Sequence, residues 1–329
     1  MVRSDLLGQM RRAPLSLPAL MAGVLLLAGC GSEGAGSHSG GPERPQVPGS
    51  PNRPDGSSCG AGSAGGASVP PGDPSEREKD GVRITGVSRG AGHCAEFELT
   101  NHEAGPFTYT ITFTFLSGAG EALASQKETV PSVGPGRTVK RAVTMSGTGP
   151  LPSGTRGPAR VKIAEVRSVP TGEASSRGGP CPPSGVRVYA DDGDAAMGLR
   201  VVGIHLENCG SGTTRLNGYP RLQLLDKAHQ PVDGVTILQG GGSIATGTGA
   251  DGAPQPLALE PGERAHATLV WRNTVEGGAG DPVNAPYVRV RATPGDAPVM
   301  VIPELDLGTT GRLGTGPWKK DGTKPPGRP

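Results

Sequence analysis

Short segments in which apolar and polar side chains alternate make up most of the chain from residue 82 onward. The clearest is 107–115, where five large apolar side chains share one face and four threonines share the other. A period of two is typical of a β-strand with one buried face, so we expect the apolar face to lie in a core. Similar patterns predict further strands over 82–87, 94–100, 138–145 and 159–166.

A second group of alternating segments follows residue 181, and turns rich in glycine, proline and aspartate separate its members. Seven strands are expected there: 186–189, 199–206, 221–225, 257–260, 266–271, 287–292 and 299–302. Neither group keeps a helical period, which argues against a doubly wound or barrel enzyme fold. The sequence therefore predicts an all-β protein with two small antiparallel, Ig-like β-sandwiches joined by flexible linkers.

Composition sets the boundaries of these domains. Residues 31–80 contain 12 Gly, 8 Pro and 9 Ser, and Val47 and Val69 are their only large aliphatic side chains. Such a segment buries too little apolar surface to offset its ordering entropy, so we expect a disordered tether. The predicted organisation is a signal peptide (1–29), a tether (30–80), a first sandwich (81–168), a linker (169–180), a second sandwich (181–317) and a disordered tail (318–329).

The first thirty residues have the order of an export signal. Arg3, Arg11 and Arg12 precede an apolar stretch over 13–27 that is too short for a stable transmembrane helix. The stretch ends in Leu27-Ala28-Gly29-Cys30, which resembles the lipobox of bacterial lipoproteins. The resemblance implies that the Cys30 thiol carries a diacylglyceryl group and anchors the mature chain to the extracellular face of the plasma membrane. An ordinary secretory peptide in which Cys30 is incidental is the alternative.

The charge balance excludes one class of partner. The chain has 32 Lys and Arg against 30 Asp and Glu, and removal of residues 1–29 takes away three Arg and one Asp, which leaves 29 of each sign. A protein that holds nucleic acid over a broad surface needs a basic excess, because phosphate contacts supply most of that affinity. We therefore expect no nucleic-acid partner.

Two stretches resemble known families. Cys181, Leu206-Glu207-Asn208-Cys209, Leu216-Asn217-Gly218-Tyr219-Pro220 and the run Leu259–Ala265 have the order and spacing of domain of unknown function 4232. This resemblance covers about 181–317 and implies a β-sandwich on an actinobacterial secreted protein or lipoprotein, with no catalytic residue to transfer. Phe113–Gly120, followed by Val133–Gly136, resembles the small bacterial Ig-like domain named for its Phe-x-Leu-Tyr-Asp motif, which implies topology only.

Four cysteines remain besides Cys30, and four allow three pairings. Disulfides persist in proteins outside the cytosol. Pairing Cys59 with Cys94, and Cys181 with Cys209, keeps each bond within one predicted domain, so we expect these two structural disulfides. Loop-closure entropy makes each worth about 3–4 kcal/mol. An unpaired Cys59 within the tether is the alternative.

Two catalytic or cofactor motifs lack the context that their chemistry needs. Gly86-Val87-Ser88-Arg89-Gly90 matches G-x-S-x-G, but no helix follows Ser88 as a nucleophile elbow requires. Residues 247–252 match G-x-G-x-x-G, but Pro254 and Pro256 forbid the helix start that would hold a pyrophosphate, which predicts a flexible loop instead. We therefore assign no catalytic and no cofactor-binding residue.

Metal ligands are equally scarce in the pattern. Asp191, Asp192 and Asp194 offer oxygens that suit Ca²⁺, but the EF-hand spacing is missing. The histidines after residue 200 do not cluster at metal-ligand spacing. We therefore assign no metal site.

What remains is the loop surface, where sandwiches usually carry recognition. The longest and most glycine-rich loop runs from 239 to 255, and its polar members are candidate partner contacts: Gln239, Ser243, Thr246, Thr248, Asp251 and Gln255. We expect a non-catalytic cell-envelope lipoprotein that binds or scaffolds an exported protein or a cell-wall component. An accessory wall-modifying hydrolase and a small-ligand-binding lipoprotein are the alternatives.

The anchor is directly testable, because Cys30→Ala removes the thiol to which the lipid is attached. Two acyl chains hold a protein firmly on a bilayer, at about 0.8 kcal/mol per buried CH₂. We expect the Cys30→Ala chain in the culture medium and the unchanged chain in the membrane fraction, as measured by immunoblotting. Continued membrane fractionation of the variant would contradict the anchor.

Overall fold

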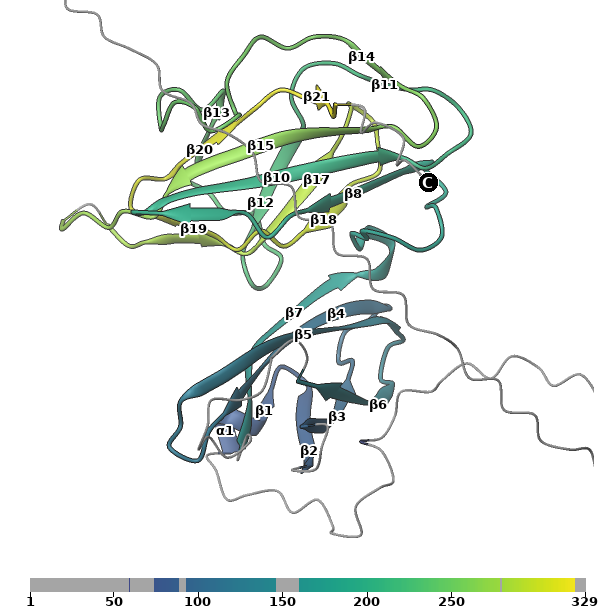
Figure 1. Ribbon diagram of the computed structural model, residues 1–329, viewed down its shortest axis with the longest axis vertical. Coiled ribbons are helices and arrows are strands. Elements are labelled where there is room, and N and C mark those ends of the chain that lie inside the picture. Colours follow the sequence, from purple (N-terminus) through teal and green to yellow (C-terminus); the bar gives the residue numbers. More distant parts are fainter. Residues whose placement is uncertain (1–58, 60–73, 89–92, 146–159, 279, 323–329) are drawn as a thin grey trace, which may run out of the picture. The chain divides into compact units, whose positions relative to one another are not determined.

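The computed structural model describes residue 59 and residues 74–88, 93–145, 160–278 and 280–322. Cys30 lies outside this described part. Within it the chain is almost entirely β-structure and forms two sandwich-like domains, so the all-β prediction is confirmed (Figure 1). No helix of the described residues is long and apolar enough to cross a membrane. The chain from Pro54 onward, which contains both sandwiches, groups into one compact unit.

The first sandwich packs two antiparallel sheets. One has the order β1 (Glu78–Lys79), β2 (Val82–Ser88), β3 (Cys94–Thr100), β6 (Thr138–Thr144); the other has the order β5 (Ala122–Val133), β4 (Phe107–Leu116), β7 (Arg160–Pro170). A four-residue helix, α1 (Pro74–Arg77), precedes β1. These early elements belong to the sandwich, so the folded part begins before the predicted boundary at residue 81.

The alternation along β4 determines which of its faces is buried. Ile111, Phe113 and Phe115 are fully buried, and the ring of Phe113 packs against Phe97 of β3 with centroids 4.9 Å apart. The intervening threonines point to the other face of the sheet, as the period of two requires. The aromatic side chains are therefore core, and the polar outer face of this sheet is left for other contacts.

The second sandwich opposes a large sheet to a smaller one. The large sheet has the order β13 (Thr236–Gln239), β20 (Arg312–Thr315), β15 (Arg264–Arg272), β10 (Leu199–Asn208), β8 (Val186–Ala190), with β21 (Lys319–Lys320) beside β15 and β9 (Asp194–Ala196) beside β10. The smaller sheet has the order β12 (Arg221–Leu225), β17 (Tyr287–Arg291), β18 (Val299–Val301). Two strand pairs complete it, β11 (Thr214–Leu216) with β14 (Leu257–Leu259) and β16 (Val283–Ala285) with β19 (Leu305–Gly308). The strands named here pair antiparallel except β13 with β20.

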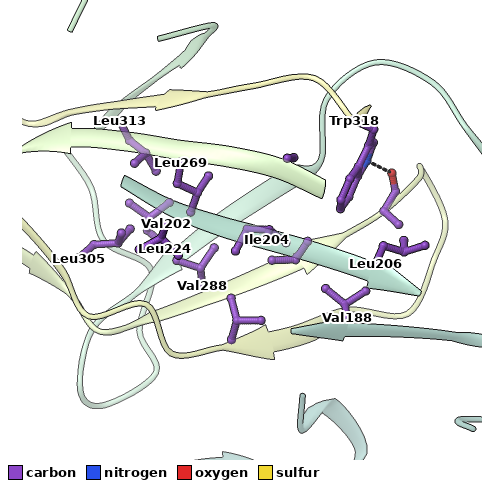
Figure 2. Close-up of a cluster of buried hydrophobic side chains, with 14 of the residues drawn as sticks. Val188, Val202, Ile204, Leu206, Leu224, Leu269, Val288, Leu305, Leu313 and Trp318 are labelled. Carbon is purple, nitrogen blue, oxygen red and sulfur yellow. Dashed lines mark hydrogen bonds between the residues drawn. The ribbon is translucent and has the colours of Figure 1, made fainter. Parts of the chain in front are cut away.

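Branched aliphatic side chains from both sheets fill the second core (Figure 2). Ile204 and Leu206 of β10 are completely buried, and Val288 of β17 faces them. Trp318 closes one end of this core at 2% exposure, and its indole N–H donates to the Ala292 carbonyl over 3.2 Å. Because Trp318 and β21 are integral to the sandwich, the prediction of a disordered tail from residue 318 is wrong at its start; residues 323–329 lie outside the described part.

The predicted linker is also held in place. Val169, at the end of β7, is buried at 4% exposure, and a 3₁₀ turn (Thr171–Glu173) follows it. Glu173 accepts a hydrogen bond from Arg289 Nε at 2.6 Å, and Ala174 forms a β-bridge with Met300. Residues 169–174 are therefore bound to the second sandwich, which differs from the free linker that their composition predicts.

Each sandwich has a buried asparagine at the end of a central strand: β3 in the first sandwich and β10 in the second. Asn101 follows β3 and Asn208 ends β10, and both side chains are at most 1% exposed. Asn208 Nδ2 donates to the Gly212 and Leu259 carbonyls, both at 2.8 Å, and its Oδ1 accepts from the Gly210 amide. These bonds satisfy the buried Leu259 carbonyl and hold the loop around Gly212 against the end of β10.

Asn101 makes the same set of bonds in the first sandwich. Its Nδ2 donates to the carbonyl four residues on, at Gly105, and to Val133, two residues before a Pro-Gly turn. Leu259 likewise stands two residues before a Pro-Gly turn. Since β2-β3-β6 and β8-β10-β15 also share one strand order, the two sandwiches are built around the same corner.

We expect Asn208→Ala to destabilise the protein by about 1–3 kcal/mol, because it leaves the buried Leu259 carbonyl without its donor. Urea unfolding followed by tryptophan fluorescence reports this directly, since Trp271 and Trp318 both lie in the second core. The exposed Asn217 provides the matched control, and Asn217→Ala should change stability by no more than about 0.5 kcal/mol. Equal effects of the two substitutions would contradict a structural role for the corner.

Candidate functional site

The outer face of the β5-β4-β7 sheet carries two rows of polar side chains. The strand register places one residue of each strand side by side in each row. The rows are Thr129–Thr110–Arg167 and Lys127–Thr112–Glu165. The alternation that buries the aromatic side chains of β4 thus gathers hydroxyls and charges on the opposite face.

These rows form one wall of a cleft of about 260 Å³. The opposite wall comes from residues that follow the first sandwich in sequence: Ser175, Arg177, Ala190, Asp192, Ile302 and Glu304. The cleft therefore combines the polar sheet face of one sandwich with segments next to β8 and β18 of the other. Ligand sites occur preferentially where two domains meet.

Arg167 is the central charge of the cleft. It is only 8% exposed, and its Nε and Nη2 donate to the two carboxylate oxygens of Glu304, each at 2.7 Å. Nη2 also donates to Glu165. Such a two-pronged pair fixes the geometry of both partners, and breaking one leaves a buried charge uncompensated.

The backbone at Glu304 is adapted to this contact. Glu304 has φ = 53°, in the left-handed region that a non-glycine residue rarely adopts. His229, which donates from Nε2 to the Ser168 carbonyl at 2.8 Å, has φ = 59°. Glu304 and His229, which bind residues near the end of β7, thus have uncommon backbone conformations. Such conformations concentrate at functional sites.

Burial raises the pKa of Glu165, and the nearby negative charge of Glu304 raises it further. Arg167 acts in the opposite direction but does not cancel the shift. Burial likewise raises the pKa of Tyr287, whose hydroxyl oxygen accepts a hydrogen bond from the Ser168 amide at 3.0 Å. A carboxyl with a raised pKa in a cleft is a marker of functional sites.

Several groups in the cleft are free to bind a ligand. Among the described residues, no side-chain hydrogen bond or ion pair involves Thr110, Thr112, Thr129 or Lys127. The carboxylates, in contrast, already have partners: Glu165 and Glu304 in Arg167, and Asp192 in Arg177, 3.6 Å away. The arrangement therefore offers hydroxyls and one ammonium group to a polar ligand.

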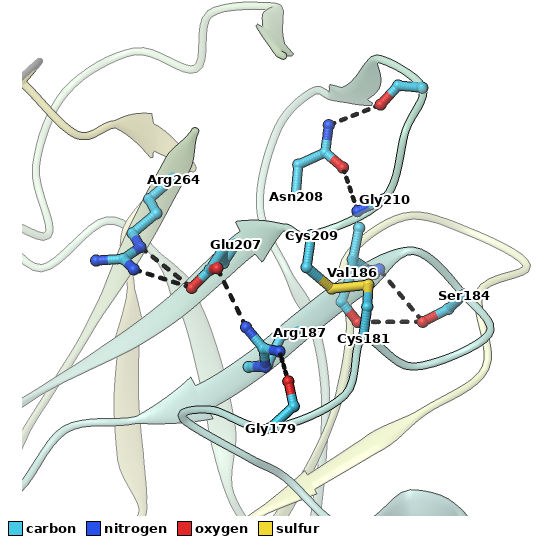
Figure 3. The surroundings of a disulfide bond; sticks show 11 residues. Gly179, Cys181, Ser184, Val186, Arg187, Glu207, Asn208, Cys209, Gly210 and Arg264 are labelled. Atoms are coloured by element: carbon cyan, nitrogen blue, oxygen red, sulfur yellow. Dashed lines mark hydrogen bonds and ion pairs between the residues drawn. A yellow bond between two sulfur atoms is a disulfide. The ribbon is translucent and has the colours of Figure 1, made fainter. Parts of the chain in front are cut away.

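Both predicted disulfides are present, Cys59–Cys94 and Cys181–Cys209. Figure 3 shows that the second bond joins the segment before β8 to the end of β10, directly beside Asn208. Glu207, the preceding residue, is bound by Arg187 and by Arg264, each at 3.1 Å. The disulfides are structural and lie outside the cleft lining.

The glycine-rich loop is held against the sheet. Ala250 is fully buried, Asp251 Oδ1 accepts from the Gly241 amide at 3.2 Å, and Lys319 Nζ donates to the Gly249 and Asp251 carbonyls, both at 2.7 Å. The prediction of a flexible loop over 247–252 therefore differs from the structure. Gly247, Gly249 and Gly252 have positive φ, so this string of glycines serves tight turns.

The candidate contact residues of this loop do not share one environment. Gln239, Ser243, Thr246 and Gln255 are exposed, whereas Thr248 and Asp251 are half-buried. Ser243 accepts a hydrogen bond from Arg312. None of the six lines the cleft. Their role as partner contacts stays a prediction.

The three aspartates considered for calcium do not converge. Asp191 binds His205, Asp192 lines the cleft, and Asp194 lies exposed in β9. No group of three or more His, Cys, Asp or Glu in the described residues is arranged to hold a metal ion. Ser88 ends β2, and Arg89 and Gly90 of its motif lie outside the described part.

The sequence did not single out Arg167, Glu165 or Glu304. Charged residues on the polar face of a strand usually face solvent, and Glu304 lies 137 positions from Arg167. Only the alternation over 159–166 contained a relevant signal, because it places Glu165 on the face opposite Val166.

One comparison with known proteins supports part of this picture. A family model described as Domain of unknown function (DUF4232) matches residues 181–319, which confirms the prediction for the second sandwich. The match begins at Cys181 and extends past Trp318, in agreement with the burial of that side chain. No curated protein matches the chain.

The raised pKa of Glu165 gives a prediction with a definite sign. The folded state binds this proton more tightly than the unfolded state, so stability is lost as pH rises from the ordinary value of 4.5 through the folded pKa. Gln carries no charge at any pH. We therefore expect the stability of Glu165→Gln relative to the unchanged protein to increase between pH 4 and pH 7, measured by urea unfolding.

Glu98→Gln is the matched control with the opposite sign. Hydrogen bonds from Arg83 and Lys140 lower the pKa of Glu98, so its ionisation stabilises the folded state. The relative stability of that variant should decrease over the same pH range. A Glu165→Gln profile that is flat or follows the control would contradict the assigned environment of Glu165.

Proposed function

We propose that the protein is a non-catalytic cell-envelope lipoprotein that binds another exported component in the cleft around Arg167. Cys30 attaches it to the outer face of the plasma membrane. The partner is an exported protein or a cell-wall component, and the charge balance disfavours nucleic acid. In this proposal the first sandwich is related to the small bacterial Ig-like domain.

One observation carries the binding role: within the described residues the carboxylates of the cleft are paired with Arg167 or Arg177, while three threonine hydroxyls and the Lys127 ammonium group have no partner. Arg167 bonds Glu304 through two atoms and Glu165 through one, so neither carboxylate is free to act as a base. Thr110, Thr112 and Thr129 can each donate and accept a hydrogen bond. A fixed array of this kind suits recognition of a polar surface more than bond cleavage.

Export is supported by the sequence before Cys30 and by the two disulfides. Each bond lies within a single sandwich, one in the first and one in the second, and such bonds persist where the environment is oxidising. They contribute to the stability of two small cores that contain few aromatic side chains. This combination is typical of proteins that work outside the cytosol.

A wall-modifying hydrolase is the second candidate, and the pair Glu165 and Glu304 favours it. A carboxyl with a raised pKa next to a second carboxyl is the kind of pair that general acid catalysis uses. Glu165→Gln separates the two functions. It should abolish turnover by an enzyme but leave binding through the threonine hydroxyls in place.

The experiment is photo-cross-linking in intact cells. In each of three variants, one threonine is replaced by a photoreactive residue. Thr129 lies exposed in the cleft, Thr246 lies exposed in the glycine-rich loop, and Thr114 is the matched control on the same face of β4 but outside the lining. We expect adducts from Thr129 well above those from Thr114, detected by mass spectrometry of the membrane fraction.

Adducts from Thr246 in place of Thr129 would transfer the binding role to the loop and contradict the cleft. Equal yields from Thr129 and Thr114 would contradict specific binding altogether. A measurable hydrolytic activity that Glu165→Gln abolishes, with the Thr129 adduct retained, would favour the enzyme.

A further inference from the structure

A second group of functional side chains lies on the outer face of the large sheet of the second sandwich, apart from the cleft. Tyr189 of β8, His205 of β10 and His266 of β15 are directly opposite one another in the strand register. The Tyr189 and His205 rings stack with centroids 5.1 Å apart, and the two imidazole centroids are 6.2 Å apart. Both histidine side chains are accessible, at 26% and 35% exposure.

Each imidazole is bound to a carboxylate through one nitrogen. His205 Nε2 lies 3.0 Å from Asp191 Oδ2, and His266 Nδ1 lies 2.6 Å from Asp321 Oδ1. An ionised carboxylate only accepts hydrogen bonds, so the bonded nitrogen of each ring carries the proton. In the neutral ring the other nitrogen then holds the lone pair, which is Nδ1 of His205 and Nε2 of His266.

Nδ1 of His205 and Nε2 of His266 have no hydrogen-bond partner among the described residues, and neither atom is buried. They therefore face solvent, on two rings that the strand register places side by side. Lys319, which stands opposite His266 on β21, does not occupy them because its ammonium group binds two loop carbonyls.

The fold holds both carboxylates in position. Asp191 Oδ1 accepts from the Gly193 and Gly203 amides at 3.0 and 2.8 Å. A Cβ at Gly203 would come within 2.3 Å of Asp191 Oδ2 and 2.8 Å of His205 Nε2, so only glycine leaves room for this pair. Asp321 is fixed by its own amide, which donates to the Arg264 carbonyl at 2.9 Å.

We propose that His205 and His266 bind one divalent transition-metal ion, of the kind that prefers imidazole, through Nδ1 of His205 and Nε2 of His266. Metal-bound histidines nearly always donate their second ring N–H to a carboxylate or carbonyl, as both rings do here. Zn²⁺, Ni²⁺ and Cu²⁺ suit imidazole ligands. The protein supplies two ligands, and water or an external ligand completes the coordination.

The two rings must approach each other slightly to share one ion. Each Zn–N bond is about 2.0–2.1 Å long, and the ring centroids are 6.2 Å apart, so a small side-chain rotation is needed for tetrahedral coordination by both imidazoles. The four described cysteines do not compete with the histidines for a metal ion, because all four are in disulfides. This site does not depend on the proposed binding function of the cleft.

The test is titration of the purified full chain in detergent with ZnCl₂ and with NiCl₂, followed by isothermal calorimetry. We expect saturable binding of one ion, weakened at least tenfold by His205→Ala and by His266→Ala. His102→Ala, at an exposed histidine of the first sandwich, should leave binding unchanged. Asp191→Asn should weaken it less than His205→Ala, since it disturbs only the orientation and tautomer of the ligand.

A second measurement needs no substitution and is independent of variant folding. Substoichiometric Cu²⁺ should broaden the NMR signals of the His205 and His266 ring protons before those of His93, His102 and His229. Uniform broadening of all histidine signals, absence of saturable binding, or a Kd that both alanine variants leave unchanged would each overturn the proposal.

Discussion

Each sandwich depends on one buried amide that replaces missing backbone partners where a central strand leaves its sheet. Two carbonyls at this corner, those of Gly212 and Leu259, accept hydrogen bonds from Asn208 Nδ2. Asn208 supplies two donors and one acceptor from a single side chain. Asn101 does the same in the first sandwich. The hydrophobic alternation sets the register of the neighbouring strands, and therefore the face on which each side chain lies, while the asparagines hold the point at which the central strand ends.

The two candidate sites are consequences of that register. A period of two buries one set of side chains and exposes the other, so a strand that builds the core also builds an ordered polar surface. On β4 the exposed set consists of threonines beside Arg167 and Glu165. On β10 it includes His205, with Tyr189 on one side and His266 on the other. Two sandwiches with the same strand order thus carry two different polar surfaces, one in the cleft around Arg167 and one on the outer face of the large sheet.

The sequence predicted the strands that have a clear period and a dense apolar face. β3 and β12 were predicted over their full length, because turns bound them closely on both sides. β5 was missed, since its inward positions include Gln126 and Glu128, which give no apolar pattern. β21 was missed because glycine, proline and lysine surround Trp318, and such a composition normally indicates a tail.

The two candidate sites could not be predicted from the alternation of apolar and polar residues, for a different reason. His205 and His266 are 61 positions apart, and Arg167 and Glu304 are 137 apart, so only the pairing of distant segments brings them together. The disulfides were predictable because four cysteines allow few pairings and two domains restrict them further. The position of Cys59 within a low-complexity segment gave no indication of the structure around it.

The location of Trp318 and β21 makes the last described residues part of the second core. The first sandwich is complete once the chain reaches Pro170, whereas the second needs the chain as far as Asp321. The carboxylate at position 304 that pairs with Arg167 likewise comes from late in the sequence. The second sandwich can therefore close only after nearly the whole chain is available, and a chain cut before Trp318 would lack one end of that core.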